Sequence, residues 1–339
     1  MKQMRGWMFS VCLVSLFLLL LHASADGEEL SGKLAQIFSG ELPPRSLDDL
    51  RAMEQIQLKL SEQAILVTVG VQIGPAQGSG VIVSSDGLVL TAAHVAQKPG
   101  LDVRFKLPNG DDARGKTLGL NRQIDAGMMK ITDTREGGWP HVEMGDFKQV
   151  RTGQWVIATG HPGGYVPGRR PVVRLGRVLR KRDSVLTTDC PLIGGDSGGP
   201  LFDMFGKVIG INSRIGGALT ANMHVPVSTY QEDWQRLVAS EMWGAVPSGE
   251  PYIGISGGSE KQQGVDGALI EWIKPGGPGD KSGLEVGDVI KSFGSKPLAN
   301  FQALVIEVSG RKPGEKVKLK VQRGEKLLDL ELLIGKAGD

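Results

Sequence analysis

Short apolar segments alternate with turn-forming residues along the central part of the chain, from Ala64 to about Pro226. Glycine, proline and asparagine separate the segments, and these residues favour turns over long helices. Residues 78–83 and 88–92, for example, flank an Asp-Gly pair that is typical of a β-hairpin turn. The pattern predicts an all-β barrel fold for residues 64–246.

The first 25 residues have a different pattern. Lys2 and Arg5 charge the start, an almost wholly apolar run follows, and Ala-Ser-Ala at positions 23–25 resembles a cleavage signal. The run is shorter than a comfortable membrane span. Residues 1–25 therefore predict a secretory signal peptide, and a membrane contact is expected only if this leader stays uncleaved.

An N-terminal arm is predicted over residues 26–63. Residues 26–44 carry turn formers and few periodic apolar positions, so we expect them to be irregular. Ser46 is a predicted helix cap, since apolar residues repeat at near-helical spacing after it, at Leu47, Leu50, Met53 and Ile56.

The C-terminal part of the chain predicts a second, small α+β unit over residues 252–336. A Pro- and Ser-containing linker is expected at 247–251. Residues 267–273 and 316–321 read as strands, and 299–309 as a helix.

The most informative motif is Gly-Asp-Ser-Gly-Gly-Pro at positions 195–200. A serine between glycines can lie on a tight turn while neighbouring backbone N–H groups point into the same space. That is the arrangement of a nucleophile beside an oxyanion hole. A plain structural turn is the alternative reading of these residues alone.

A serine nucleophile needs a histidine base and a carboxylate that orients it. Among the five histidines, His94 directly follows the predicted hairpin. Asp125 is a single acid beside the mostly apolar residues 126–131, where a carboxylate requires hydrogen-bonding partners. Asp133 lies nearby and is the alternative for the carboxylate.

The order His94, Asp125, Ser197, with Thr-Ala-Ala-His at positions 91–94 and the motif at 195–200, resembles the HtrA/Deg group of serine proteases. This resemblance implies a mainly β fold, with a two-barrel chymotrypsin-like domain followed by a PDZ domain. It also implies that Ser197 is the nucleophile, His94 the general base and then acid, and Asp125 the residue that fixes the histidine tautomer. The backbone N–H groups of Gly195 and Ser197 would form the oxyanion hole.

Residues 275–278 and 283–290 are similar to segments of HtrA-type PDZ domains. In such a domain, backbone N–H groups bind a peptide C-terminal carboxylate while the peptide adds a strand to the sheet edge. The resemblance places the carboxylate-binding loop at Tyr252, Ile253, Gly254 and Ile255. It further implies a homotrimer supported by the N-terminal region.

The specificity pocket of this fold is walled by residues just before the nucleophile and by the strand after it. The predicted pocket residues are Ile193, Ser213, Ile215 and His224. No acid occupies the base of the pocket, so cleavage after lysine or arginine is not expected. Ile193 and Ile215 favour an aliphatic residue at the cleaved position.

The chain departs from the HtrA pattern at Asp196, where asparagine is usual, and at residues 222–226, where a more apolar segment is usual. Asp196 is similar to the acid of trypsin-like enzymes that pairs with a new N-terminus after activation. No basic activation motif precedes Ala64, so zymogen cleavage is not expected. Seven basic residues lie between positions 169 and 182, and we interpret them as solvated strand edges and loop tips.

Composition excludes several classes of protein. The net charge is +2, and removal of the leader would leave 37 basic and 37 acidic residues, so no nucleic-acid footprint is present. Cys190 is the only cysteine beyond the leader, which excludes an internal disulfide, and its expected role is a buried apolar residue. No cofactor or metal site is expected.

Taken with the leader, these features predict an exported serine endopeptidase, periplasmic or extracellular. It would hydrolyse unfolded or misfolded polypeptides through an acyl-enzyme, and its PDZ domain would bind C-terminal peptides. The alternative is a peptide-binding holdase or scaffold with a weakly active or inactive protease domain.

Overall fold

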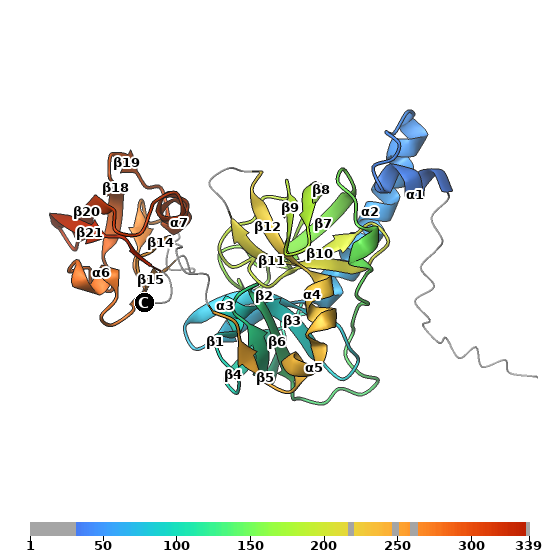
Figure 1. The fold of residues 1–339 in the computed structure, drawn as a ribbon, viewed down its shortest axis with the longest axis horizontal. Coiled ribbons are helices and arrows are strands. Elements are labelled where there is room, and N and C mark those ends of the chain that lie inside the picture. Colours follow the sequence, from blue (N-terminus) through green and yellow to red (C-terminus); the bar gives the residue numbers. More distant parts are fainter. Residues whose placement is uncertain (1–31, 216–219, 246–250, 258–263, 337–339) are drawn as a thin grey trace, which may run out of the picture.

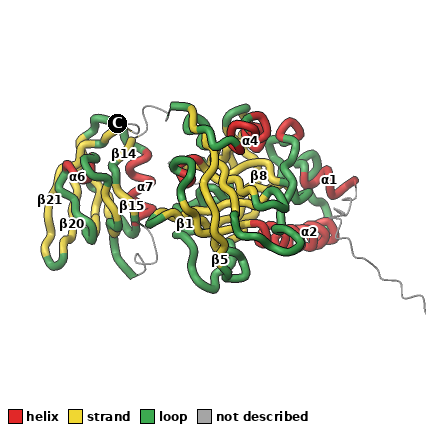
Figure 2. Tube along the Cα trace, turned by 90° about the horizontal axis from the view of Figure 1, so that it is seen from below, coloured by secondary structure: helices red, strands yellow, loops and turns green. Residues whose placement is uncertain are grey.

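The computed structural model describes residues 32–215, 220–245, 251–257 and 264–336. The predicted leader and most of the predicted linker lie outside these ranges. Two β-barrels form the larger unit, and a small α+β unit follows them (Figures 1 and 2). None of the helices in these ranges is both long and apolar enough to cross a membrane.

Two helices precede the barrels, α1 (Gly32–Phe38) and α2 (Leu47–Val67). The predicted cap of α2 is present, because the Asp49 N–H donates to Ser46 Oγ at 3.1 Å and the Ser46 N–H donates to Asp49 Oδ2 at 3.2 Å. Figure 1 shows α2 against the second barrel, and its outer face exposes Leu47, Leu50 and Leu58.

Two predictions for this arm are wrong. Residues 32–38 are helical rather than irregular, because Ile37 and Phe38 are buried in the core cluster of the second barrel. That tertiary burial stabilises a helix too short to be evident from its own periodicity. The barrel domain also begins later than Ala64, since α2 continues to Val67 and the first strand starts at Thr68.

The first barrel closes through pairing of its fifth and sixth strands. Its strands alternate inward and outward residues, and the inward side chains make an apolar core around Phe105, Leu120 and Met129. The strands are β1 (Thr68–Ile73), β2 (Ala76–Ile82), β3 (Leu88–Ala92), β4 (Asp102–Lys106), β5 (Asp112–Asn121) and β6 (Ala126–Ile131).

The second barrel is a closed sheet in the order β10-β11-β12-β9-β8-β7. Its core contains Ile157, Leu201 and Ile211, and Cys190 is buried in the same cluster, as predicted. The strands are β7 (Trp155–Gly160), β8 (Val172–Arg182), β9 (Val185–Thr188), β10 (Pro200–Asp203), β11 (Val208–Ile215) and β12 (Asn222–Pro226).

Short elements connect or close the barrels. The strand β13 pairs in parallel with β5 at the edge of the first barrel. These elements are α3 (Ala93–Ala96), η1 (Phe147–Gln149), α4 (Val227–Glu232), α5 (Trp234–Val238) and β13 (Met242–Trp243).

The C-terminal unit has its own apolar core, around Phe293, Leu304 and Leu319. A long hairpin dominates its sheet, with alternating buried apolar and exposed charged residues on its first strand, β20. The elements are β14 (Pro251–Tyr252), β15 (Ile255–Ser256), β16 (Ala268–Leu269), β17 (Trp272–Ile273), α6 (Pro278–Lys281), β18 (Val289–Phe293), β19 (Lys296–Pro297), α7 (Phe301–Ser309), β20 (Lys316–Arg323), β21 (Lys326–Leu333) and β22 (Gly335–Lys336).

Candidate active site

His94 and Asp125 meet at the end of two paired strands. β3 and β6 are antiparallel with Ala92 opposite Ala126, so the residues just beyond this pair are neighbours. The Nδ1 atom of His94 lies 2.9 Å from Asp125 Oδ2 and 3.0 Å from Oδ1, and the His94 backbone N–H donates to Oδ1 at 3.0 Å. The carboxylate therefore fixes both the backbone and the ring of His94.

Asp125 is enclosed by hydrogen-bond donors and is only 6 % exposed. It lies in the turn before β6, with a left-handed φ of +64°, rather than in the strand itself. Burial raises the pKa of Asp125, but the charge and hydrogen bonds of His94 and the Ser213 hydroxyl outweigh it and lower this pKa to about 2. The carboxylate is thus ionised at neutral pH.

The alternative carboxylate, Asp133, is paired with Arg114. Its Oδ2 accepts from the Arg114 N–H at 2.8 Å, and its Oδ1 accepts from Arg114 Nε at 3.1 Å. Asp125 is therefore the carboxylate beside His94.

The Ser197 turn is anchored by β2 and β11. The Ser79 N–H donates to the Ser197 carbonyl at 2.8 Å, and the Ser79 hydroxyl donates to the Gly195 carbonyl at 2.8 Å. From the other side, the Gly198 N–H donates to the Asn212 carbonyl at 2.7 Å. Sequence reasoning missed Ser79, for which the only signal was a polar side chain within a strand predicted to be apolar.

Glycine 78 lies between the Ser197 turn and α3, which carries His94. A Cβ at this position would come within 2.8 Å of Val95 Cγ1 and 3.2 Å of the Ser197 carbonyl oxygen. Ser197 and His94 thus flank the same short stretch of β2, although they are far apart in the chain.

The two N–H groups predicted to form an oxyanion hole are available. Within the described ranges, no backbone or side-chain acceptor takes the N–H of Gly195 or of Ser197. Gly195 has a φ of +93°, which only glycine adopts without strain, and its backbone packs against the carbonyl of His161.

Residues 78–211 match the family model of the trypsin-like peptidase domain, and residues 251–334 match the family model of the PDZ domain. The chain therefore contains a trypsin-like peptidase domain followed by one PDZ domain. The predicted resemblance to the HtrA/Deg group and the predicted two-barrel fold are confirmed.

Several known proteins are similar to this chain. A protein of Pseudomonas putida named "Probable periplasmic serine endoprotease DegP-like" is 32 % identical over 77 % of this chain and 56 % of its own length. A relative of the same name from Rickettsia conorii is 31 % identical over 76 % and 53 %. A solved serine endoprotease from Yersinia pestis aligns over 87 % of this chain and 99 % of its own, with 23 % identity and a TM-score of 0.47. The chain spans about half the length of the curated relatives it matches.

Two of the four residues predicted for the specificity pocket of the peptidase domain have other partners. The Ser213 hydroxyl donates to Asp125 Oδ2 at 2.5 Å, so this side chain supports the carboxylate. His224 is 1 % exposed, with Nδ1 2.9 Å from Asn212 Oδ1 and Nε2 2.8 Å from Thr188 Oγ1. Burial lowers the pKa of His224 to about 3, so the ring is neutral and does not titrate near pH 7.

The other two predicted pocket residues, Ile193 and Ile215, are apolar. Ile193 is 41 % exposed beside the nucleophile turn, and Ile215 is half-buried against the core of the second barrel. A cavity of about 280 Å³ lies next to Asp125, between the β5–β6 turn and the second barrel, and Ile124, Ser213 and Met223 are among its lining residues.

In the PDZ domain, the predicted carboxylate-binding loop connects β14 and β15. Gly254 has a φ of +71°, and Ile253 is buried in the core of the domain. Within the described ranges, no acceptor takes the N–H of Ile253 or Gly254. Ile255 is paired with Ile273 in the β15–β17 ladder.

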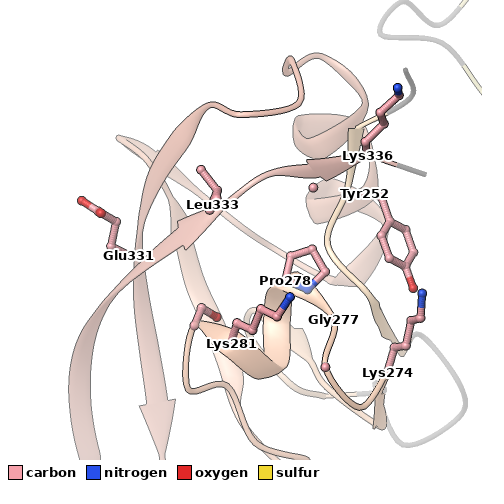
Figure 3. Close-up of a pocket in the computed structure, with 11 residues that line it drawn as sticks. Tyr252, Lys274, Gly277, Pro278, Lys281, Glu331, Leu333 and Lys336 are labelled. Atoms are coloured by element: carbon pink, nitrogen blue, oxygen red, sulfur yellow. The ribbon is translucent and has the colours of Figure 1, made fainter. Parts of the chain in front are cut away.

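Tyr252 instead contributes to a neighbouring pocket of about 260 Å³ (Figure 3). Its ring lies beside Lys274, whose ammonium is 5.5 Å from the ring centroid, and Leu333 lies on the opposite side of the pocket. The residues 253–255 do not line this pocket, although Gly254 lies against the Tyr252 ring. Neither domain, as far as it is described, gathers three side chains that could hold a metal ion.

Proposed function

We propose that this chain is an exported serine endopeptidase that hydrolyses unfolded or misfolded polypeptides through an acyl-enzyme. The observation that carries the proposal is the buried Asp125 carboxylate, held on Nδ1 of His94 beside the anchored Ser197 turn. The relatives named periplasmic serine endoproteases support both the activity and a periplasmic location.

The proposed mechanism follows from these contacts. The Ser197 hydroxyl attacks the peptide carbonyl while Nε2 of His94 takes its proton, and His94 then gives that proton to the leaving amine. Asp125 keeps the Nδ1 proton in place and stabilises the imidazolium. The N–H groups of Gly195 and Ser197 donate to the oxyanion, and water then releases the acyl group by the reverse path.

The exposed side chain of Ile193 and the apolar Ile215 support cleavage after aliphatic residues. Self-association of the chain stays a prediction, supported by the leucines exposed on α2.

A labelling experiment with the wild-type chain tests the function. A fluorophosphonate probe is expected to label about one site per chain, because only an activated serine reacts with it, and casein is expected to be cleaved. Both assays include a C-terminal peptide that occupies the PDZ domain, and heat-unfolded chain is the control. A folded chain that stays unlabelled, leaves casein intact and suppresses aggregation of an unfolded protein would favour the holdase instead.

The second proposal is that the PDZ domain binds peptide C-termini at the loop of residues 252–255. It rests on the N–H groups of Ile253 and Gly254, since two such donors can bind one carboxylate. A fluorescent peptide with an apolar last residue is expected to bind at least about tenfold more tightly as the free acid than as the amide, because amidation removes the charge from both hydrogen bonds. Fluorescence anisotropy measures the two affinities, and equal affinities would contradict this site.

A further inference from the structure

Asp196, the residue directly before the nucleophile, is fully buried and carries a charge partner. Its side chain is 0 % exposed. The Arg174 guanidinium meets it at two points, since Nη1 donates a hydrogen bond to Oδ1 at 3.2 Å and Nη2 lies 3.0 Å from Oδ2 in an ion pair, and the Arg174 side chain is itself only 13 % exposed. Such a two-point contact fixes orientation as well as charge.

The same carboxylate closes the turn that carries the oxyanion donors. Oδ2 of Asp196 accepts from the Ile193 N–H at 3.0 Å, while the Asp196 N–H donates to the Ile193 carbonyl at 3.1 Å. Gly195 lies inside this loop of hydrogen bonds and Ser197 follows it directly. The direction of the Asp196 side chain is therefore coupled to the direction of both N–H groups.

Gly160, the last residue of β7, leaves space for this carboxylate. A Cβ on Gly160 would come within 2.6 Å of Asp196 Oδ1, so a larger residue at the end of β7 would push the side chain out. Arg174 comes from the adjacent strand, where it lies opposite Ala158. The cation is thus presented by a barrel strand rather than by a loop.

Burial raises the pKa of Asp196, and Arg174 opposes this effect, as Arg169 does from farther away. Without a cation, the buried carboxylate would have to take up a proton or leave its site. Either change alters the hydrogen bonds that shape residues 193–197. The sequence-based interpretation of the basic cluster as solvated edges is wrong for Arg174, because its partner lies inside the barrel domain.

We propose that Arg174 is a positioning residue that supplies, from within the chain, the cation that holds Asp196 inward and keeps the Gly195 and Ser197 N–H groups aimed at one point. Asp196 then needs no newly cut N-terminus as its partner. The catalytic part of this inference rests on the proposed peptidase function.

Three variants test the pair: Arg174→Met, Asp196→Asn, and the double variant. Asparagine removes the charge but keeps an oxygen for the Ile193 N–H, so the double variant no longer needs a cation. Arg180→Met is the matched control, since Arg180 is an exposed arginine on the same strand.

The first readout is hydrogen exchange of the backbone amides in residues 193–199, which does not depend on activity. Arg174→Met is expected to speed exchange in this segment by about tenfold or more, and Asp196→Asn in the same chain is expected to restore it. Arg180→Met should leave exchange unchanged. Unchanged exchange in folded Arg174→Met, or no restoration in the double variant, would overturn the inference.

The second readout is peptide hydrolysis. Arg174→Met is expected to lower kcat by about 10- to 100-fold with KM changed less than about threefold, because the lost interaction acts on the transition state. The double variant should recover to within about threefold of Asp196→Asn. A merely structural pair would lower the melting temperature and leave the kcat of the folded enzyme unchanged, which would also overturn it. An inactive wild type whose exchange still responds to Arg174→Met would reject the peptidase function and retain the positioning role.

Discussion

Replacement of Ser197 by alanine is expected to lower kcat for peptide hydrolysis by about 10⁶-fold, to the residual level that binding and the oxyanion donors alone provide. The change removes one oxygen atom from a turn whose backbone is held by Ser79 and Asn212. These contacts use main-chain atoms of the turn, so the fold should remain. The melting temperature is therefore expected to stay within a few degrees of the wild-type value.

Kinetics with a quenched fluorescent peptide, together with fluorophosphonate labelling, measure this loss. Ser295→Ala is the matched control, because Ser295 is an exposed serine in the turn between β18 and β19. The control should keep wild-type rates. If Ser197→Ala kept even one per cent of the wild-type kcat, Ser197 would not be the nucleophile.

Replacement of Asp125 by asparagine is expected to lower kcat by about 10⁴-fold. The Nδ1 atom of His94 lies within 3.0 Å of both carboxylate oxygens, and Oδ2 also accepts from Ser213. An asparagine must place an NH₂ group at one of these positions. The donor favours the wrong tautomer of His94, and it also removes the charge that stabilises the imidazolium.

Asp133→Asn is the control for this experiment, since Asp133 pairs with Arg114 at the surface and should not affect kcat. Ordinary peptide kinetics near neutral pH distinguish the two variants. Full activity of Asp125→Asn, or an equal loss in both variants, would remove Asp125 from the proposed mechanism.

Much of the architecture could be predicted from local patterns. The hairpin of β2 and β3 follows from an Asp-Gly turn between two apolar segments, and the cap of α2 follows from Ser46 and its neighbours. The helix α1 could not be predicted in this way. Its stability comes from burial of Ile37 and Phe38 against a barrel that is distant in the sequence.

In the candidate site, too, some residues could be predicted from the sequence and others could not. His94 and Ser197 lie in short motifs, so their residue types and spacing predict them as catalytic residues. The sequence predicts Ser213 to be part of a pocket wall, because it lies on the strand after the nucleophile. Its hydroxyl instead reaches Asp125, 88 positions earlier in the chain.

From the sequence alone, the order of His94, Asp125 and Ser197, the strand-rich fold and the two-domain division could be determined. These features depend on local turn chemistry, alternation and motif spacing, which act within a few residues. The tertiary structure alone decided the partners of the buried polar groups, including Arg174 for Asp196 and Ser213 for Asp125. A buried carboxylate needs hydrogen-bond donors, and barrel closure and strand register decide which donors lie near it. Neither barrel closure nor strand register can be predicted from the residues adjacent to the carboxylate.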